Sequence, residues 1–136
     1  MAFIRNTGKT KEVYFPKTAS TALALGDAVV LSSGQIVKAT SSTANILGIC
    51  KRAVVSTDSD YASTTLIPIE VPVEKSVEWL VPVSTGSATA TSVGVTYDLT
   101  DSAGINVNST SQNAVIVTRF ISATQVAVVI NKPVLA

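Results

Sequence analysis

Two short acidic loops contain the residue types in this sequence that are best able to support chemistry. One has Asp58 and Asp60 on either side of a serine, and the other has Asp98 and Asp101, next to Tyr97. Paired carboxylates can bind calcium or act in general acid–base catalysis. However, neither loop has the further oxygen ligands and the closing glutamate of an EF-hand, and aspartate is also a common turn residue. We therefore expect structural roles for both loops and no metal site.

The residues that usually activate a nucleophile are missing from the sequence. It contains no histidine, which excludes Ser-His and Cys-His pairs as well as histidine metal sites. The single cysteine, Cys50, lies in an apolar run and is expected to be a buried, inert thiol. One thiol also excludes an intrachain disulfide and a zinc site built from several thiolates. We therefore expect no catalytic residue, no cofactor and no enzymatic activity.

The composition is typical of a folded, all-β protein. The 136 residues are 46% hydrophobic and only 14% charged, with a net charge of +1. Chains this apolar should fold, and a charge balance this close to zero argues against nucleic acid as a partner. Valine, serine and threonine are frequent, and β-branched residues fit a pleated sheet better than a helix. No run approaches a membrane span and no signal-peptide core is present, so we expect no membrane contact and synthesis in a cytoplasm.

The clearest strand pattern lies between residues 66 and 83. Apolar residues occupy the odd positions except at Lys75, where the pattern is interrupted, while glutamates and prolines occupy most of the even ones, which predicts strands with one solvated face. Pro68 and Pro72 would leave the same strand edge without two donors. Residues 66–73 are therefore predicted to be an edge strand, or a strand covered by something other than a regular ladder. Trp79 falls on the apolar face, as an anchor of either the core or an interface.

About ten strands are predicted, including hairpins near 28–39 and 93–107, with a helix or turn only near 18–25. Glycines and apolar residues recur in a similar order in 26–55 and 94–121. Either these are two stacked β-units, dividing the chain into 18–83 and 84–136, or they share only what all hairpins share. The residues predicted to be buried are Val29, Leu31, Val37, Ile49, Ile67, Ile69, Val71, Trp79, Val81, Val95, Tyr97, Val117, Val128 and Ile130.

Residues 1–17 are predicted to be an extended N-terminal arm ahead of a β domain at 18–136. The arm carries four cations against Glu12, a net charge of +3, whereas 58–101 carry seven acidic residues against Lys75, a net charge of −6. Either both regions are simply solvated, or the arm lies on a partner. In the second case the arm is mobile when free, and residues 11–16 pair as a strand with a neighbour. The contact residues predicted for it are Arg5, Lys9, Lys11, Val13, Tyr14 and Phe15.

Three stretches resemble the core of tailed-phage head decoration proteins, also called capsid cement proteins, of the lambda-type β-tulip family. They are 25–31 (LGDAVVL), 34–40 (GQIVKAT) and 46–49 (ILGI). The strand at 66–71 is similar in outline, and 93–100 looks like extensions in related phage structural proteins. The resemblance covers roughly residues 23–131 and implies a compact β-tulip or β-barrel-like fold.

The same resemblance implies a structural function. Such proteins bind the outside of an expanded icosahedral shell, commonly as trimers, and clamp neighbouring major capsid subunits. Their N-terminal arm often adds a strand to a capsid loop. We therefore expect a virion protein on the outer capsid surface, made in the host cytoplasm, with the major capsid protein and two further copies as partners. The alternatives are a phage tail or neck component, or a β-sandwich ligand-binding module, although aromatic residues make up only 5% of the chain.

Overall fold

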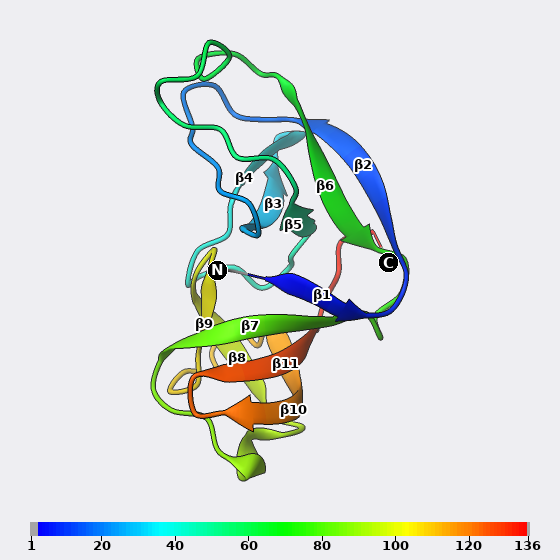
Figure 1. Cartoon of the computed structure of the whole chain (residues 1–136), viewed down its shortest axis with the longest axis vertical. Helices are drawn as coiled ribbons and strands as arrows, with labels where there is room; N and C mark the ends of the chain where they lie inside the picture. Colours follow the sequence, from blue (N-terminus) through cyan, green and yellow to red (C-terminus); the bar gives the residue numbers. More distant parts are fainter. Residues whose placement is uncertain (1–2, 136) are drawn as a thin grey trace.

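The computed structural model describes residues 3–135, which form two β-sheets, one above the other in Figure 1. In this range the only helical segment is the short 3₁₀ turn η1 (Ala90–Ser92), and no helix is long and apolar enough to cross a membrane. The expected all-β fold is therefore confirmed. The strands are β1 (Ile4–Thr7), β2 (Thr10–Pro16), β3 (Ala28–Ser32), β4 (Gln35–Lys38), β5 (Gly48–Cys50), β6 (Leu66–Pro72), β7 (Glu78–Thr85), β8 (Thr96–Asp101), β9 (Gly104–Asn106), β10 (Val115–Ser122) and β11 (Gln125–Ile130).

Five strands form a closed barrel in the lower half of Figure 1, in the order β7, β11, β10, β8, β9. All neighbours are antiparallel except β7 and β9, which close the barrel as a parallel pair through Val83 and Ile105. β1 pairs with the first half of β7 and extends the same sheet. Trp79 and Val81 point inward and are fully buried, because the alternation along β7 separates barrel interior from exterior.

The second sheet has the order β2, β6, β5, β3, β4 and is antiparallel throughout. An isolated parallel bridge between Lys17, just after β2, and Ile36 on β4 brings the two outer strands together at one end. The sheet therefore curls around its own core. The buried members of that core are Leu23, Val29, Ile36, Leu47, Cys50, Val54, Ile67, Ile69 and Val71.

The two sheets are joined by shared packing and by buried hydrogen bonds. Ala28 and Ile49 of the second sheet belong to the same apolar cluster as Trp79 in the barrel. The N–H of Ala28 donates to the carbonyl of Ser102 at 2.8 Å, and the Ser102 hydroxyl donates to the buried Asp27 carboxylate at 3.1 Å. Since Ser102 lies in the β8–β9 turn, these bonds hold the barrel against the second sheet.

The sequence repeat has a structural counterpart. In each sheet a hairpin is followed by a loop and by a strand that pairs antiparallel with the first strand of that hairpin. These are β3–β4 followed by β5, and β8–β9 followed by β10. The stretches 26–55 and 94–121 therefore share one local topology, with one copy in each sheet.

Eleven of the fourteen residues predicted to be buried are buried, and Trp79 is a core residue of its own chain. The register inferred from the odd positions is therefore confirmed at 67–71 and 77–83. Leu31 and Val37 are half-buried because they belong to the β3–β4 hairpin, where β4 is an outer strand. Val95 is 36% exposed because it lies in the short segment between η1 and β8.

The helix allowed near residues 18–25 does not form. Leu23 exchanges two backbone hydrogen bonds with Val54, each 2.9 Å long, and Ser20 has a φ of 53°. A helix would have required these backbone groups to pair within the segment. Because Leu23 pairs with the distant Val54 instead, the segment forms a loop over the end of the second sheet.

Of the two alternatives predicted for 66–73, the edge strand is wrong, because β6 lies between β2 and β5. Its two prolines are tolerated for a local reason. The N–H of Lys51 donates to the carbonyl of Pro68, which shows that the even residues of β6 direct their backbone groups toward β5. β5 is only three residues long and pairs with β6 at Ile69 and Glu70. Pro68 and Pro72 lie on either side of these pairs, so their lack of an N–H group interrupts no hydrogen bond of the ladder.

Replacing Val71 by alanine should lower the free energy of unfolding by about 1–3 kcal/mol, because the side chain is fully buried in the second core. Val73→Ala is the matched control, since Val73 is 45% exposed and its truncation should cost less than about 0.5 kcal/mol. Urea denaturation followed by tryptophan fluorescence measures both. Equal costs for the two variants would contradict the burial of Val71 in the second core.

Candidate protein-binding surface

The N-terminal segment is extended, as expected, but it is paired within its own chain. β1 pairs antiparallel with β7, and β2 pairs with β6 along its whole length. The expectation of a mobile arm whose residues 11–16 find a strand partner only on a neighbour is therefore wrong. The reason is that β6 and β7 each offer an edge to this segment, so its backbone gains hydrogen bonds that offset the entropy of ordering.

β2 keeps one edge without a strand partner along most of its length. It is the outermost strand of its sheet, with β6 on one side. The N–H of Val73 donates to the carbonyl of Lys9, so the odd residues of this segment direct their backbone groups to β6. The backbone N–H and C=O groups of the even residues, which are Thr10, Glu12 and Tyr14, consequently point to the open edge. Such an edge is a template for pairing with another chain.

The predicted contact residues on and beside β2 differ in exposure. Tyr14 is 56% exposed, and Lys9 and Lys11 are exposed as well. Val13 and Phe15 alternate with Tyr14 and are half-buried against the second core. A partner on this edge would therefore meet the two lysines and Tyr14 first.

Tyr14 and Leu66 form an exposed apolar patch on the outer face of β2 and β6. Tyr14 pairs with Pro68 and Pro16 pairs with Leu66, so all four side chains lie on one face. The exposed fractions of Tyr14 and Leu66 are 56% and 57%. The neighbouring Glu12 carboxylate raises the pKa of Tyr14. Leu66 was not predicted as a contact residue, although an apolar residue on the polar face of the alternation is a signal for one.

Arg5 lies on β1, apart from the other predicted contact residues, and faces Glu70 of β6. Its Nε atom is 2.8 Å from Glu70 Oε2, and Lys51 Nζ is 3.7 Å from Glu70 Oε1. The hydroxyl of Thr10 donates to the same carboxylate at 2.9 Å. The acidic group opposite Arg5 thus lies within 58–101, but it belongs to the same chain rather than to a neighbour.

A hollow of about 310 Å³ opens beside this charged group. Arg5, Lys51 and Glu70 line it, together with apolar residues from β1, the residue before β1, β5 and the loop before β3. The apolar side chains are the buried Phe3 and Ile49 and the exposed Ile4 and Leu25. The hollow therefore combines an apolar floor with a charged rim.

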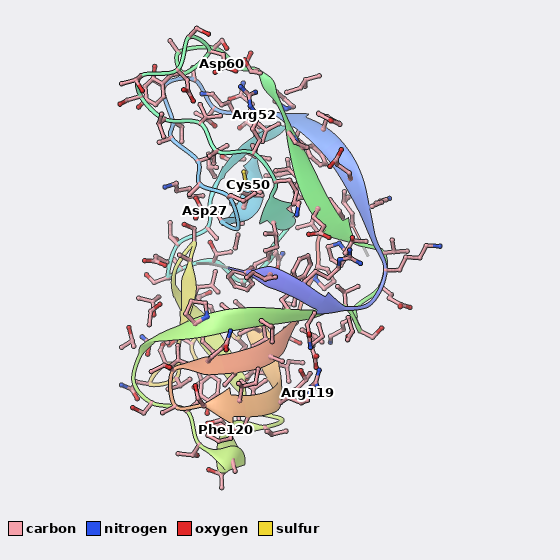
Figure 2. The ribbon with its side chains drawn as sticks, viewed as in Figure 1. Asp27, Cys50, Arg52, Asp60, Arg119 and Phe120 are labelled. Carbon is pink, nitrogen blue, oxygen red and sulfur yellow. The ribbon has the colours of Figure 1, made fainter. Side chains whose placement is uncertain are left out.

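Cys50 also lines the hollow and is a buried thiol, as predicted. Burial raises the pKa of the Cys50 thiol, which donates a hydrogen bond to the carbonyl of Arg52 at 2.9 Å. Figure 2 places Cys50 within the second sheet, between Asp27 and Arg52. A protonated thiol that is already hydrogen-bonded is a poor nucleophile, which agrees with a structural role.

Glu78 anchors a cluster on the outer face of the barrel that the sequence did not reveal. Its Oε1 atom accepts a hydrogen bond from Asn6 at 2.6 Å and pairs with Arg119, and Oε2 accepts one from Thr118 at 2.6 Å. Arg119 on β10 thereby reaches past β11 to β7. The Arg119 guanidinium has the largest effect on Glu78 and lowers its pKa to about 2. Burial of Glu78 acts in the opposite direction but is outweighed.

Acid should weaken the fold through Glu78. Because its pKa falls from 4.5 to about 2 on folding, its contribution to stability is complete above about pH 4.5 and is lost as the pH falls toward 2. We expect Glu78→Gln to be less stable than wild type at pH 6, and the difference to shrink between pH 4.5 and pH 2. Urea denaturation of both proteins at pH 6, 4, 3 and 2 measures this. A difference that stays constant with pH would show that ionisation of Glu78 is not the cause.

The first acidic loop has structural contacts. The Asp58 carboxylate accepts a hydrogen bond from the N–H of Val55 at 2.9 Å, and Asp60 pairs with Arg52 at 2.6 Å. The Arg52 guanidinium lowers the pKa of Asp60. Figure 2 shows Arg52 and Asp60 near the end of the molecule farthest from the barrel. No three His, Cys, Asp or Glu side chains within residues 3–135 are arranged to hold a metal ion.

Of the second acidic group, Tyr97 and Asp98 lie in β8 rather than in a loop, and Asp98 anchors the chain between β9 and β10. Its carboxylate accepts hydrogen bonds from the Ser109 hydroxyl and from the backbone N–H groups of Ser111, Gln112 and Asn113, at 2.5–3.1 Å. Burial alone would raise the pKa of Asp98, but these four donors outweigh burial and lower it. The carboxylate therefore acts as a structural anchor, as predicted.

Lys17 is fully buried, although it is one of the cations of the predicted N-terminal arm. Its ammonium group donates to the carbonyls of Thr18, Thr21 and Tyr61 at 3.1, 3.4 and 2.6 Å, and lies 5.4 Å from the centroid of the Tyr61 ring. Lys17 thus joins two loops at the end of the second sheet. Counting charges could not distinguish it from exposed lysines such as Lys11.

Comparison with known proteins identifies no family. No protein-family model matches the chain, and no curated protein is significantly similar to it in sequence. A function for this chain therefore has to follow from its own surfaces. Those are the open edge of β2, the Tyr14–Leu66 patch and the hollow at Glu70.

Proposed function

We propose that the chain is a structural virion protein that binds the outer surface of a phage capsid and clamps neighbouring major capsid subunits. The observation that carries this proposal is the open edge of β2. Thr10, Glu12 and Tyr14 direct backbone groups outward there, next to the exposed Tyr14–Leu66 patch. Another chain can add a strand to such an edge, so that main-chain hydrogen bonds supply affinity and the patch supplies specificity.

The resemblance of 25–31, 34–40 and 46–49 to head decoration proteins favours a capsid as the partner. Clamping requires no catalytic group. It requires a rigid body and many weak contacts repeated by symmetry, because each contact raises the effective concentration of the next. In this proposal the protein is a trimer on the shell and needs no cofactor, lipid or nucleic acid.

The location of the protein on its particle tests the proposal directly. Particles are purified from cells that make the protein and are imaged by electron cryomicroscopy. We expect density for this fold on the outer face of the shell, in groups of three. Density on the tail or neck would overturn the capsid assignment in favour of the tail alternative, and a protein found on no particle would overturn both.

Single substitutions test whether the β2 edge makes the contact. Glu12→Pro removes an outward N–H, and Tyr14→Ser removes the centre of the patch. Each should weaken binding to stripped shells by about tenfold or more, as expected for an interface hot spot. Val55→Ser is the matched control, since Val55 is an exposed apolar residue, 50% accessible, outside the patch. Unchanged binding of both edge variants would overturn the role of β2.

Salt dependence and truncation give further information on the same contact. Lys9 and Lys11 are exposed beside the edge, so binding should weaken as salt rises, with screening over about 8 Å at physiological ionic strength. Deletion of residues 2–12 is a poor test, because it removes all of β1 and the start of β2 from their ladders. Loss of binding by that deletion would reflect damage to both sheets.

A further inference from the structure

The hollow at Glu70 carries an excess of positive charge. Arg5 and Lys51 both face the single Glu70 carboxylate, which leaves one cation without a matching anion in the lining. Arg5 is held by two contacts, because Nε lies 2.8 Å from Glu70 and a terminal nitrogen donates to the carbonyl of Gly8 at 3.0 Å. Lys51 is held less closely. Its ammonium is 3.7 Å from Glu70, and its side chain is 45% exposed, so it can turn to a second carboxylate.

The apolar part of the hollow is partly uncovered. Ile4 and Leu25 are 43% and 53% exposed, whereas Phe3 and Ile49 beneath them are almost completely buried. Two large aliphatic side chains exposed around one hollow can bury substantial surface against an apolar group. An occupant that satisfies both parts of the lining therefore carries an aliphatic side chain next to a carboxylate.

The size and position of the hollow suit a piece of polypeptide. A volume of about 310 Å³ is at the lower end of the range for small-molecule sites, which is about 300–1,000 Å³. It has room for one or two side chains. Thr10, the first residue of β2, is hydrogen-bonded to Glu70, so the hollow adjoins the beginning of the open edge. A strand added to β2 would thus pass close to it.

We infer that the hollow binds a segment of a foreign protein partner in which an aliphatic residue is adjacent to a glutamate or aspartate. The aliphatic side chain lies against Ile4 and Leu25, and the carboxylate pairs with Lys51. This inference specifies the chemistry of the partner and rests on the proposed function only for the identity of that partner. Binding of the isolated segment does not depend on a capsid.

The test is a titration of the full-length, isotopically labelled protein with acetyl-Leu-Glu-amide, followed by amide chemical shifts. We expect saturable shifts at residues of the hollow such as Ile4, Gly26 and Lys51. Acetyl-Leu-Gln-amide and acetyl-Ala-Glu-amide should each bind more weakly, because each lacks one of the two groups. Equal binding of the three peptides, or shifts confined to other regions, would overturn the inference.

Two variants should change the affinity in opposite directions. Lys51→Gln should weaken binding of acetyl-Leu-Glu-amide about two- to fivefold, the usual range for a partly exposed ion pair. Glu70→Gln should strengthen it, because it removes a carboxylate that repels the incoming one and frees Lys51. Lys132→Gln, at an exposed position outside the hollow, is the control and should have no effect. If Glu70→Gln weakened binding as Lys51→Gln does, the Glu70 pair would only maintain structure and the inference would fail.

Dilution of the unliganded protein distinguishes a foreign partner from a second copy. Shifts of the hollow amides that depend on protein concentration alone would identify a second copy as the occupant and would overturn the assignment to a foreign partner. Particle localisation does not enter these experiments. A negative titration would therefore reject the role of the hollow while leaving the proposed place on the shell untouched.

Discussion

Replacing Asp98 by alanine should destabilise the protein by about 3–5 kcal/mol, one of the largest effects expected for a single polar residue. The substitution leaves four donors in and beside the β9–β10 loop without their acceptor, and the site is almost completely buried. At roughly 3–5 °C per kcal/mol for a domain of this size, the melting temperature should fall by roughly 9–25 °C.

Two further measurements separate the charge of Asp98 from its shape. Asp98→Asn keeps one acceptor oxygen and should cost less than the alanine variant. Because the pKa of Asp98 is lowered on folding, its charge stabilises the native state above the unfolded pKa of about 3.9, and that stabilisation is lost as the pH falls below it. Asp101→Ala is the control, since Asp101 is exposed and accepts one local hydrogen bond from Ala103. Similar melting temperatures for Asp98→Ala and Asp101→Ala would refute the anchoring role.

Replacing Trp79 by alanine should also cost about 3–5 kcal/mol, because it empties a large, fully buried position in the barrel. Trp79→Phe should cost only about 1 kcal/mol. Among the described residues the indole Nε1 has no hydrogen-bond acceptor. Phenylalanine removes that unsatisfied donor, and the gain offsets much of the lost packing.

Denaturation of both Trp79 variants has to be followed by circular dichroism, since the chain has no other tryptophan. Val81→Ala is a useful control in the same strand, with a smaller side chain and a smaller expected loss. If Trp79→Phe were as unstable as Trp79→Ala, the indole N–H would have to be satisfied in solution, for example by a buried water molecule.

The sequence predicted those parts of the fold that depend on local periodicity. Alternation at 67–83 identified the buried face of β6 and β7 because each strand has one face toward a core. Asp101 is a turn residue as predicted, because its carboxylate accepts a hydrogen bond from the N–H of Ala103, two residues further on. Asp98 is structural as well, but it lies in β8 and binds N–H groups 13–15 residues away, which local patterns do not reveal. The hairpins followed from turn residues between apolar runs in the same way.

The parts that the sequence did not predict depend on pairing over long distances. Nothing near residues 4–16 indicates that β7 and β6 will bind them, so the segment was interpreted as a free arm. The parallel closure of the barrel by β7 and β9 is equally invisible to local patterns. The Glu70 cluster needed Arg5 and Lys51 to be brought together from β1 and the end of β5, which charge counting along the chain cannot show.

The pairing of the N-terminal strands has a consequence for synthesis on the ribosome. Thr10 pairs with Pro72 and Ile4 pairs with Leu80, so each strand must wait for a partner that is made much later. At about 5–20 residues per second, that delay is roughly 3–15 s. β1 and β2 are thus placed only after the β3–β4 hairpin, although they precede it along the chain. During the delay both of their edges are open to other nascent chains, and charged residues such as the exposed Lys9 and Lys11 are the kind that oppose such pairing.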